Sequence, residues 1–139
     1  MRAVLLLCTC LLLAACAGDA TQSSDPAMRI RITNAGMAPL QCQMKFGHWV
    51  DRDLGTVTMS EVSVTVQQQP QDGALYIMRD DGQRRMMVEN IFCAQKDNWQ
   101  ATVGQIDLAV VRQERPKEVS VSCALPESGR VTCTEPKMQ

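Results

Sequence analysis

This 139-residue chain has few aromatic residues and a single histidine, and it lacks an apolar run long enough to cross a membrane. Hydrolase-type catalysis needs a base held by a partner beside an activated nucleophile, and one histidine leaves few such arrangements. Neither a Gly-x-Ser-x-Gly motif nor a Ser-x-x-Lys pair occurs in the sequence. We therefore expect a protein that is not an enzyme and that carries no cofactor.

Neither sign of charge is in clear excess. The chain has 14 lysines and arginines and 15 aspartates and glutamates, and both signs are scattered along it. Proteins that bind nucleic acid usually carry a clustered excess of basic residues. Nucleic acid is therefore not expected among the partners.

The N-terminus carries an apolar segment, residues 3–15, that is interrupted only by Thr9. A helix needs about 20 apolar residues to span a bilayer, so this segment is too short for a permanent membrane helix. Arg2 precedes it, and the small residues Ala14 and Ala15 end it. This pattern predicts a secretory signal peptide over residues 1–15.

Leu13, Ala14, Ala15 and Cys16 follow one another at the end of this segment. They resemble the cleavage and lipidation site of bacterial lipoproteins. The resemblance implies that the mature chain begins at Cys16 and carries more than one acyl chain there, enough to hold it firmly on a bilayer. Ala17 stands where inner-membrane lipoproteins carry an aspartate, which implies an outer-membrane protein facing the periplasm. The alternative is an ordinary secretory signal in which Cys16 has no role.

Residues 17–27 are small and polar and contain nothing to bury. A flexible chain of this length and composition spans about 18 Å on average. We expect Cys16 and this tether, residues 16–27, to hold a single folded domain, residues 28–139, close to the membrane surface.

Four cysteines remain once the signal peptide and Cys16 are set aside: Cys42, Cys93, Cys123 and Cys133. An even number in an exported domain indicates disulfide bonds. Four cysteines allow three pairings, and we favour Cys42 with Cys93 and Cys123 with Cys133, because the last two lie in one predicted hairpin. None of the spacings matches the Cys-x-x-Cys pairs of zinc modules, so no zinc site is expected.

Apolar and polar residues alternate along most of the domain, which is typical of half-buried strands in antiparallel sheets. Turn residues lie at positions 34–36, 81–82 and 126–129. The pattern predicts seven strands, at residues 28–33, 40–47, 61–66, 75–79, 84–88, 118–124 and 130–134. Residues 51–55 do not begin a complete calcium loop, and residues 67–73 are polar, so both segments are expected to connect strands.

One short helix is expected at residues 97–104, with Asp97 as its N-cap and Gly104 at its end. Several short strands in about 110 residues indicate a β-sandwich. Residues 30–34 and 39–42 are similar to the opening of immunoglobulin-like modules, as in small sandwich lipoproteins of unknown function. The expected fold is all-β: a small antiparallel Ig-like β-sandwich of about seven strands with one short helix and two disulfides.

Trp49 is out of phase with the apolar face of its strand, and Arg52 follows it closely. An exposed tryptophan beside an arginine is typical of protein interfaces, unless another element covers it. We expect a non-enzymatic, membrane-tethered envelope lipoprotein that acts as a protein-binding adaptor or assembly factor, with Trp49 and Arg52 on its partner surface. Its partners would be the bilayer, through acylated Cys16, and an envelope protein.

A lipoprotein that binds copper or a small ligand is the alternative function. The chain has nine methionines, and methionine and histidine are soft ligands for Cu(I). Met37, Met44 and His48 lie close in sequence, and the alternation places Met44 and His48 on one apolar strand face. Core packing by methionine and a histidine satisfied at the strand end account for the same residues without a metal.

Overall fold

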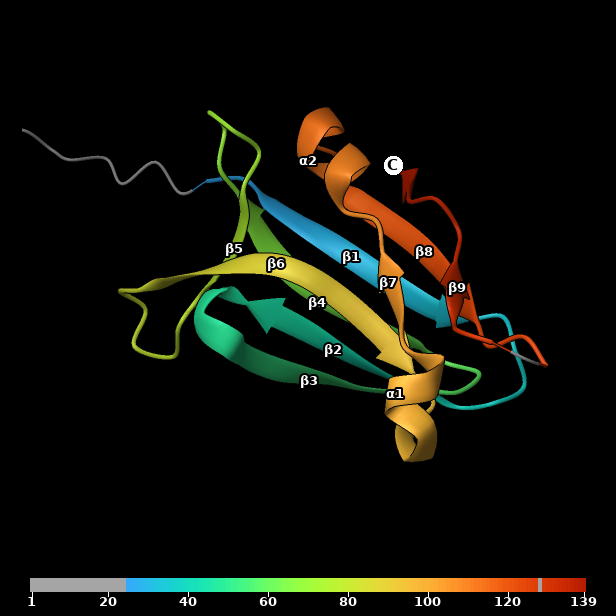
Figure 1. The fold of residues 1–139 in the computed structure, drawn as a ribbon. Coiled ribbons are helices and arrows are strands. Elements are labelled where there is room, and N and C mark those ends of the chain that lie inside the picture. The colour runs from blue at the N-terminus through green and yellow to red at the C-terminus, as the bar shows by residue number, and fades with distance from the viewer. Residues whose placement is uncertain (1–24, 128) are drawn as a thin grey trace, which may run out of the picture.

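Ten strands build the domain in the computed structural model, which describes residues 25–127 and 129–139 (Figure 1). The strands are β1 (Ala27–Asn34), β2 (Leu40–Phe46), β3 (Val50–Val57), β4 (Glu61–Gln68), β5 (Leu75–Met78), β6 (Arg85–Ala94), β7 (Gly104–Ile106), β8 (Glu118–Ala124), β9 (Thr132–Cys133) and β10 (Lys137–Met138). The helical elements are the 3-10 turns η1 (Gly47–Trp49) and η2 (Lys96–Asn98) and the helices α1 (Trp99–Thr102) and α2 (Ala109–Glu114). The expected signal peptide and Cys16 lie outside the described residues.

The strands form two packed layers that share β6 (Figure 1). One layer has the order β10-β8-β1-β4-β5-β6 and the other the order β6-β2-β3, with β7 also paired to β6 and β9 to β8. β1 and β8 are parallel, and the other pairs of described strands are antiparallel. The all-β, sandwich-like fold is confirmed, with a parallel pair that the alternation did not predict.

The alternating apolar residues fill the space between the layers. Ile30 and Ile32 of β1, Leu40 and Met44 of β2, and Ile91 of β6 have no exposed surface. Burial of a side chain of this size contributes about 1.5–3 kcal/mol relative to exposure. The apolar residues therefore determine which side of each strand points inward.

Both favoured disulfides are present. Cys42 of β2 and Cys93 of β6 are register partners and form one bond. Cys123 of β8 and Cys133 of β9 are register partners across the predicted last hairpin and form the other. Each bond joins neighbouring strands, so none of the four cysteines carries a free thiol.

The structure has ten strands rather than about seven. The seven predicted strands are all present, as β1, β2, β4, β5, β6, β8 and β9. β7 has three residues and β10 has two, too few for a period of two to be visible. The prediction of a connecting turn at residues 51–55 is wrong, because these residues lie in β3.

A bulge hides β3 from the alternation pattern. Cys42 pairs with Gly55, but the next residue, Gln43, pairs with Asp53, so Leu54 is an extra residue in β3. Gly55 has a φ of 105°, a conformation that glycine adopts without steric cost. A one-residue insertion moves later side chains to the opposite face, which breaks the period of two.

Polar pairs with β2 hold the charged strand β3 in the sheet. Lys45 donates to the carboxylate of Asp51 at 2.6 Å. Gln41 donates to Asp53 and accepts a hydrogen bond from the hydroxyl of Thr56. Cross-strand pairs of this kind contribute about 0.2–1 kcal/mol each. β3 ends the strand order of the described residues, so its sequence is compatible with an exposed edge.

The expected short helix is present as η2 and α1. Asp97 lies inside η2 rather than at its cap, and no side-chain hydrogen bond caps either element. The hydroxyl of Thr102 supports the turn by donating to the carbonyl of Asn98 at 2.7 Å. Gly104 begins β7, where a Cβ would lie 1.9 Å from the carbonyl oxygen of Val131. No helix in the described part of the chain, α2 included, is long and apolar enough to cross a bilayer.

Removal of either disulfide is expected to lower the free energy of unfolding, and the loss should be larger for the bond that closes the longer loop. The bonds join residues 51 and 10 positions apart. The chain-entropy model gives a loss of about 4 kcal/mol for Cys42→Ala with Cys93→Ala, and about 3 kcal/mol for Cys123→Ala with Cys133→Ala. Urea unfolding followed by circular dichroism measures both losses, and a larger loss for the shorter loop contradicts the expectation.

Candidate functional site: a cleft where the chain enters the domain

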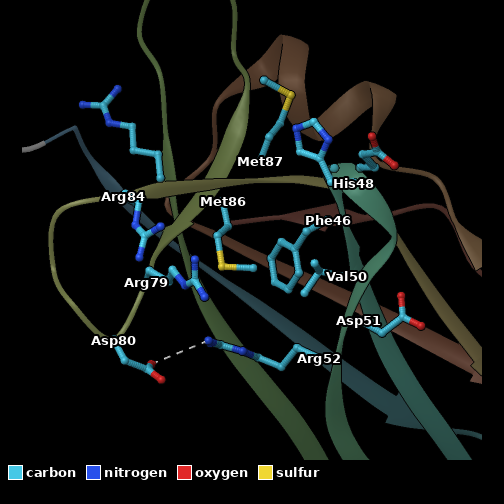
Figure 2. A pocket seen from close by; sticks show the side chains of 13 residues that line it. Phe46, His48, Val50, Asp51, Arg52, Arg79, Asp80, Arg84, Met86 and Met87 are labelled. Atoms are coloured by element: carbon cyan, nitrogen blue, oxygen red, sulfur yellow. Dashed lines mark ion pairs between the residues drawn. The ribbon is translucent and has the colours of Figure 1, made fainter.

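One end of the domain is hollowed by a cleft of about 930 Å³ (Figure 2). One wall is η1 with the start of β3, and the other is the β5–β6 turn with the start of β6. The lining residues are Phe46, Gly47, His48, Val50, Asp51, Arg52, Arg79, Asp80, Arg84, Arg85, Met86, Met87 and Glu89. Phe46 ends β2 opposite Val88, whereas β6 begins at Arg85. The cleft lies where β6 extends beyond β2.

The cleft has an apolar floor and a charged rim. Figure 2 shows the Phe46 ring and the Met86 side chain between the two walls. The guanidinium of Arg52 lies 5.9 Å from the centre of the Phe46 ring, within the range of a cation–π contact. The rim carries four arginines: Arg52, Arg79, Arg84 and Arg85.

An exposed ion pair crosses the mouth of the cleft (Figure 2). Arg52 and Asp80 approach to 4.0 Å, and the Asp80 side chain is fully exposed. Exposed pairs contribute about 0–1 kcal/mol, so another carboxylate can displace Asp80 from Arg52 at little cost. The cleft can thus accept an apolar side chain on its floor and an acidic group at its rim.

Asp81 fixes the turn that forms one wall. Its carboxylate accepts hydrogen bonds from the backbone N–H groups of Gln83 at 2.9 Å and Arg84 at 3.1 Å, and from the Arg84 side chain at 2.9 Å. Gly82 has a φ of 66°, but φ of Asp81 is not positive, and the N–H of Gly82 donates to the carbonyl of Arg79. The turn is therefore longer than the two-residue Asp-Gly turn predicted. The hydrogen bond from Gln83, followed by those from Arg84, lowers the pKa of Asp81 to about 2. The carboxylate therefore stays charged in acid in which an ordinary aspartate is already protonated.

The opposite wall, η1, contains two residues in a left-handed conformation. His48 has a φ of 67° and Trp49 a φ of 64°, which costs a non-glycine residue about 1–2 kcal/mol. The expectation that His48 continues the apolar face of β2 is wrong, because the strand ends at Phe46 and His48 is exposed. The side chain of Trp49 is also in solvent, with 98% of its surface exposed.

Arg52 and Trp49 lie at the same end of the domain but in different hollows. Arg52 lines the cleft, whereas Trp49 borders a second hollow of about 390 Å³ together with Lys45 and Phe92. Phe46, His48 and Glu89 line both hollows. The hollows therefore adjoin, and the two residues predicted as one partner surface lie on either side of the residues that the hollows share.

The chain enters the domain beside the cleft. Asp25 accepts a hydrogen bond from the hydroxyl of Tyr76 at 2.5 Å and lies 3.3 Å from the guanidinium of Arg85, which lines the cleft. Arg85 stacks over the Tyr76 ring at 4.4 Å. Burial raises the pKa of Tyr76, and the bond to Asp25 raises it further. The carbonyl of Pro26 accepts from the N–H of Gln68, so the last residues assigned to the tether are held against the domain.

The three candidate copper ligands are not brought together. Met37 is fully exposed in the loop between β1 and β2, Met44 is fully buried, and His48 is exposed beyond the other end of β2. The ends of a seven-residue strand lie about 20 Å apart, too far for one ion. No group of three or more His, Cys, Asp or Glu residues that could hold a metal occurs within residues 25–127 and 129–139.

The chain was also compared with known proteins. No protein-family model, curated protein or solved structure matches it. The cleft and its surroundings are therefore the basis on which a function is inferred.

Sequence reasoning identified Arg52 but missed the second wall of the cleft. Arg79, Arg84 and Arg85 flank the predicted Asp-Gly turn, and this cluster of arginines at a hairpin tip was the available signal. Phe46 lies on the core face of its strand, as the alternation predicts, and is only 2% exposed. Its place on the floor of the cleft depends on where β2 ends relative to β6, which the local sequence does not show.

Because the pKa of Asp81 is low, the hydrogen bonds that its carboxylate accepts in the β5–β6 turn are expected to persist in acid. A lowered pKa favours the charged form, so the hydrogen bonds of the carboxylate persist below its usual pKa of about 4 and are lost as the pH falls through about 2. Carbon NMR of the side-chain carboxyl should give a midpoint near that value. Arg84→Ala should raise the midpoint, and a native midpoint at about 4 contradicts the assignment.

Replacement of Trp49 by glycine is expected to stabilise the domain. The side chain is 98% exposed and φ is positive, so glycine removes backbone strain and loses little burial. The free energy of unfolding should rise by up to about 1 kcal/mol in Trp49→Gly. Trp49→Ala keeps a Cβ and should show no such gain; equal values for the two variants in urea unfolding rule out strain at this residue.

Proposed function

We propose that the protein is a non-enzymatic lipoprotein of the bacterial envelope, anchored in the outer membrane through acylated Cys16, that acts as an adaptor for another envelope protein. The cleft between η1 and the β5–β6 turn is the binding site for that partner. The main support for this proposal is the position of the cleft. The cleft lies beside Asp25, at the end of the domain where the chain that follows Cys16 enters.

The cleft has the composition of a site for a peptide segment. The half-buried Met86 and the edge of the otherwise buried Phe46 ring form an apolar floor, and Arg52 and Arg79 offer guanidinium groups at the rim. Arginine is among the residues that contribute most to protein interfaces. A partner segment that combines an apolar side chain with an acidic one fits this arrangement, because its carboxylate can replace Asp80 at Arg52.

The edge strand β3 offers a second element for recognition. It borders the cleft at Val50 to Arg52 and is the last strand of its layer among the described strands. An edge strand presents unpaired backbone groups to which an extended segment can add. The partner segment therefore lies along β3 with side chains entering the cleft.

The two disulfides make the adaptor rigid, which limits the entropy lost when a partner binds.

We also propose that the domain is related to immunoglobulin-like domains. The two packed layers support it, but Cys42–Cys93 joins neighbouring strands, whereas the disulfide of antibody domains joins the two sheets.

In-cell photocrosslinking of the full chain tests the adaptor function. A photoreactive amino acid replaces Val50, which lines the cleft, or Met59, which is fully exposed on the loop between β3 and β4. The same envelope protein should be captured from position 50 and not from position 59. Arg52→Ala should abolish capture, and Arg130→Ala, the matched loss of an exposed arginine far from the cleft, should not.

Each part of the proposal has its own contrary result. Equal capture from positions 50 and 59, or capture unaffected by Arg52→Ala, contradicts the cleft as the binding site. Cys16→Ser should release the protein from the membrane and reduce capture, because tethering raises the effective concentration near a membrane partner. Unchanged membrane attachment of Cys16→Ser contradicts the lipid anchor.

A further inference from the structure

We propose that the end of the domain that carries the cleft rests on the bilayer, with Trp49 in the headgroup region of the membrane. The inference rests on the proposed acylation of Cys16 and adds an orientation to the proposed function. In this orientation Trp49 contacts lipid, whereas Arg52 and the cleft bind the protein partner.

The entry point of the chain determines which end of the domain is near the anchor. Asp25 is held by Tyr76 and Arg85 at the cleft end. Eight residues separate it from Cys16, so the two residues lie at most about 30 Å apart. The eight residues of β1 carry the chain about 26 Å towards the opposite end. The cleft end is therefore the end nearer to the bilayer.

Trp49 has the exposure and chemistry of an interfacial anchor. Its side chain is 98% exposed, and two successive left-handed residues direct it away from the core. Tryptophan combines a large apolar ring with an N–H donor and is enriched at membrane–water interfaces.

The charges at this end indicate a contact that does not depend on anionic lipid. The four arginines of the rim lie among five carboxylates: Asp51, Asp80 and Glu89 line the same cleft, and Asp81 and Asp25 pair with Arg84 and Arg85. The attraction of the arginines to lipid phosphates is therefore largely compensated. We expect the contact to come from the ring of Trp49 and the acyl chains of Cys16, with little sensitivity to salt.

The chain contains its own control, because its second tryptophan lies at the other end of the domain. Trp99 begins α1, which follows the far end of β6 (Figure 1). In the full acylated chain, Trp99→Phe leaves Trp49 as the only tryptophan, and Trp49→Phe leaves only Trp99. Both proteins are reconstituted on vesicles of phosphatidylethanolamine and phosphatidylglycerol, with or without lipid brominated near the headgroup.

When the protein binds these vesicles, the emission of Trp49 should shift to the blue and should be quenched by the brominated lipid. The emission of Trp99 should not change in either respect. The result should be the same without phosphatidylglycerol and at high salt. If aqueous iodide still quenches the fluorescence of Trp49 when the acylated chain is bound to vesicles, the inference is wrong. The proposed adaptor function is not affected by that result. Protection of Trp49 in native membranes but not on vesicles also overturns it and points to a protein. A chain without acyl groups on Cys16 overturns the anchor and the orientation together.

Discussion

The pairing of β6 with strands of both layers is the constraint on which the rest of the structure depends. β6 pairs with β5 from Arg85 to Met87 and with β2 from Val88 onward. One backbone ladder therefore joins the two layers, and Cys42–Cys93 ties β2 to β6. Where β6 passes the end of β2 at Phe46, it has only β5 beside it. The space beyond Phe46 is closed by η1 on one side and by the β5–β6 turn on the other, and this space is the cleft.

The direction of the strands brings the cleft and the entry of the chain to one end. β1 leads away from Asp25, and β2 returns to η1. Side-chain contacts strengthen this arrangement, since Arg85 both lines the cleft and pairs with Asp25. In the function proposed above, a partner would meet the adaptor next to the membrane, where a tether has the largest effect on local concentration.

Most of the strands could be predicted because their side chains alternate in a way that only a half-buried strand requires. Ile30 and Ile32 show this in β1, and the disulfide of Cys123 and Cys133 followed from a hairpin visible in sequence. Gln68 shows the opposite case. It lies in a run of glutamines that reads as a loop, yet it is 2% exposed and its amide donates to the carbonyl of Val111 at 3.1 Å. Its burial depends on α2, a distant segment that no local pattern connects to it.

The sequence by itself determined the class of the fold, the favoured cysteine pairing and the position of most turns, because alternation and turn chemistry act over a few neighbouring residues. Only the tertiary structure decided that charged residues 51–53 form an edge strand, since their partners lie on β2. It also decided that Arg52 lies opposite the arginines of the β5–β6 turn, and that Trp49 points outward at the end where the chain enters. These features arise from the register between strands distant in sequence, which is set by the packing of the whole core.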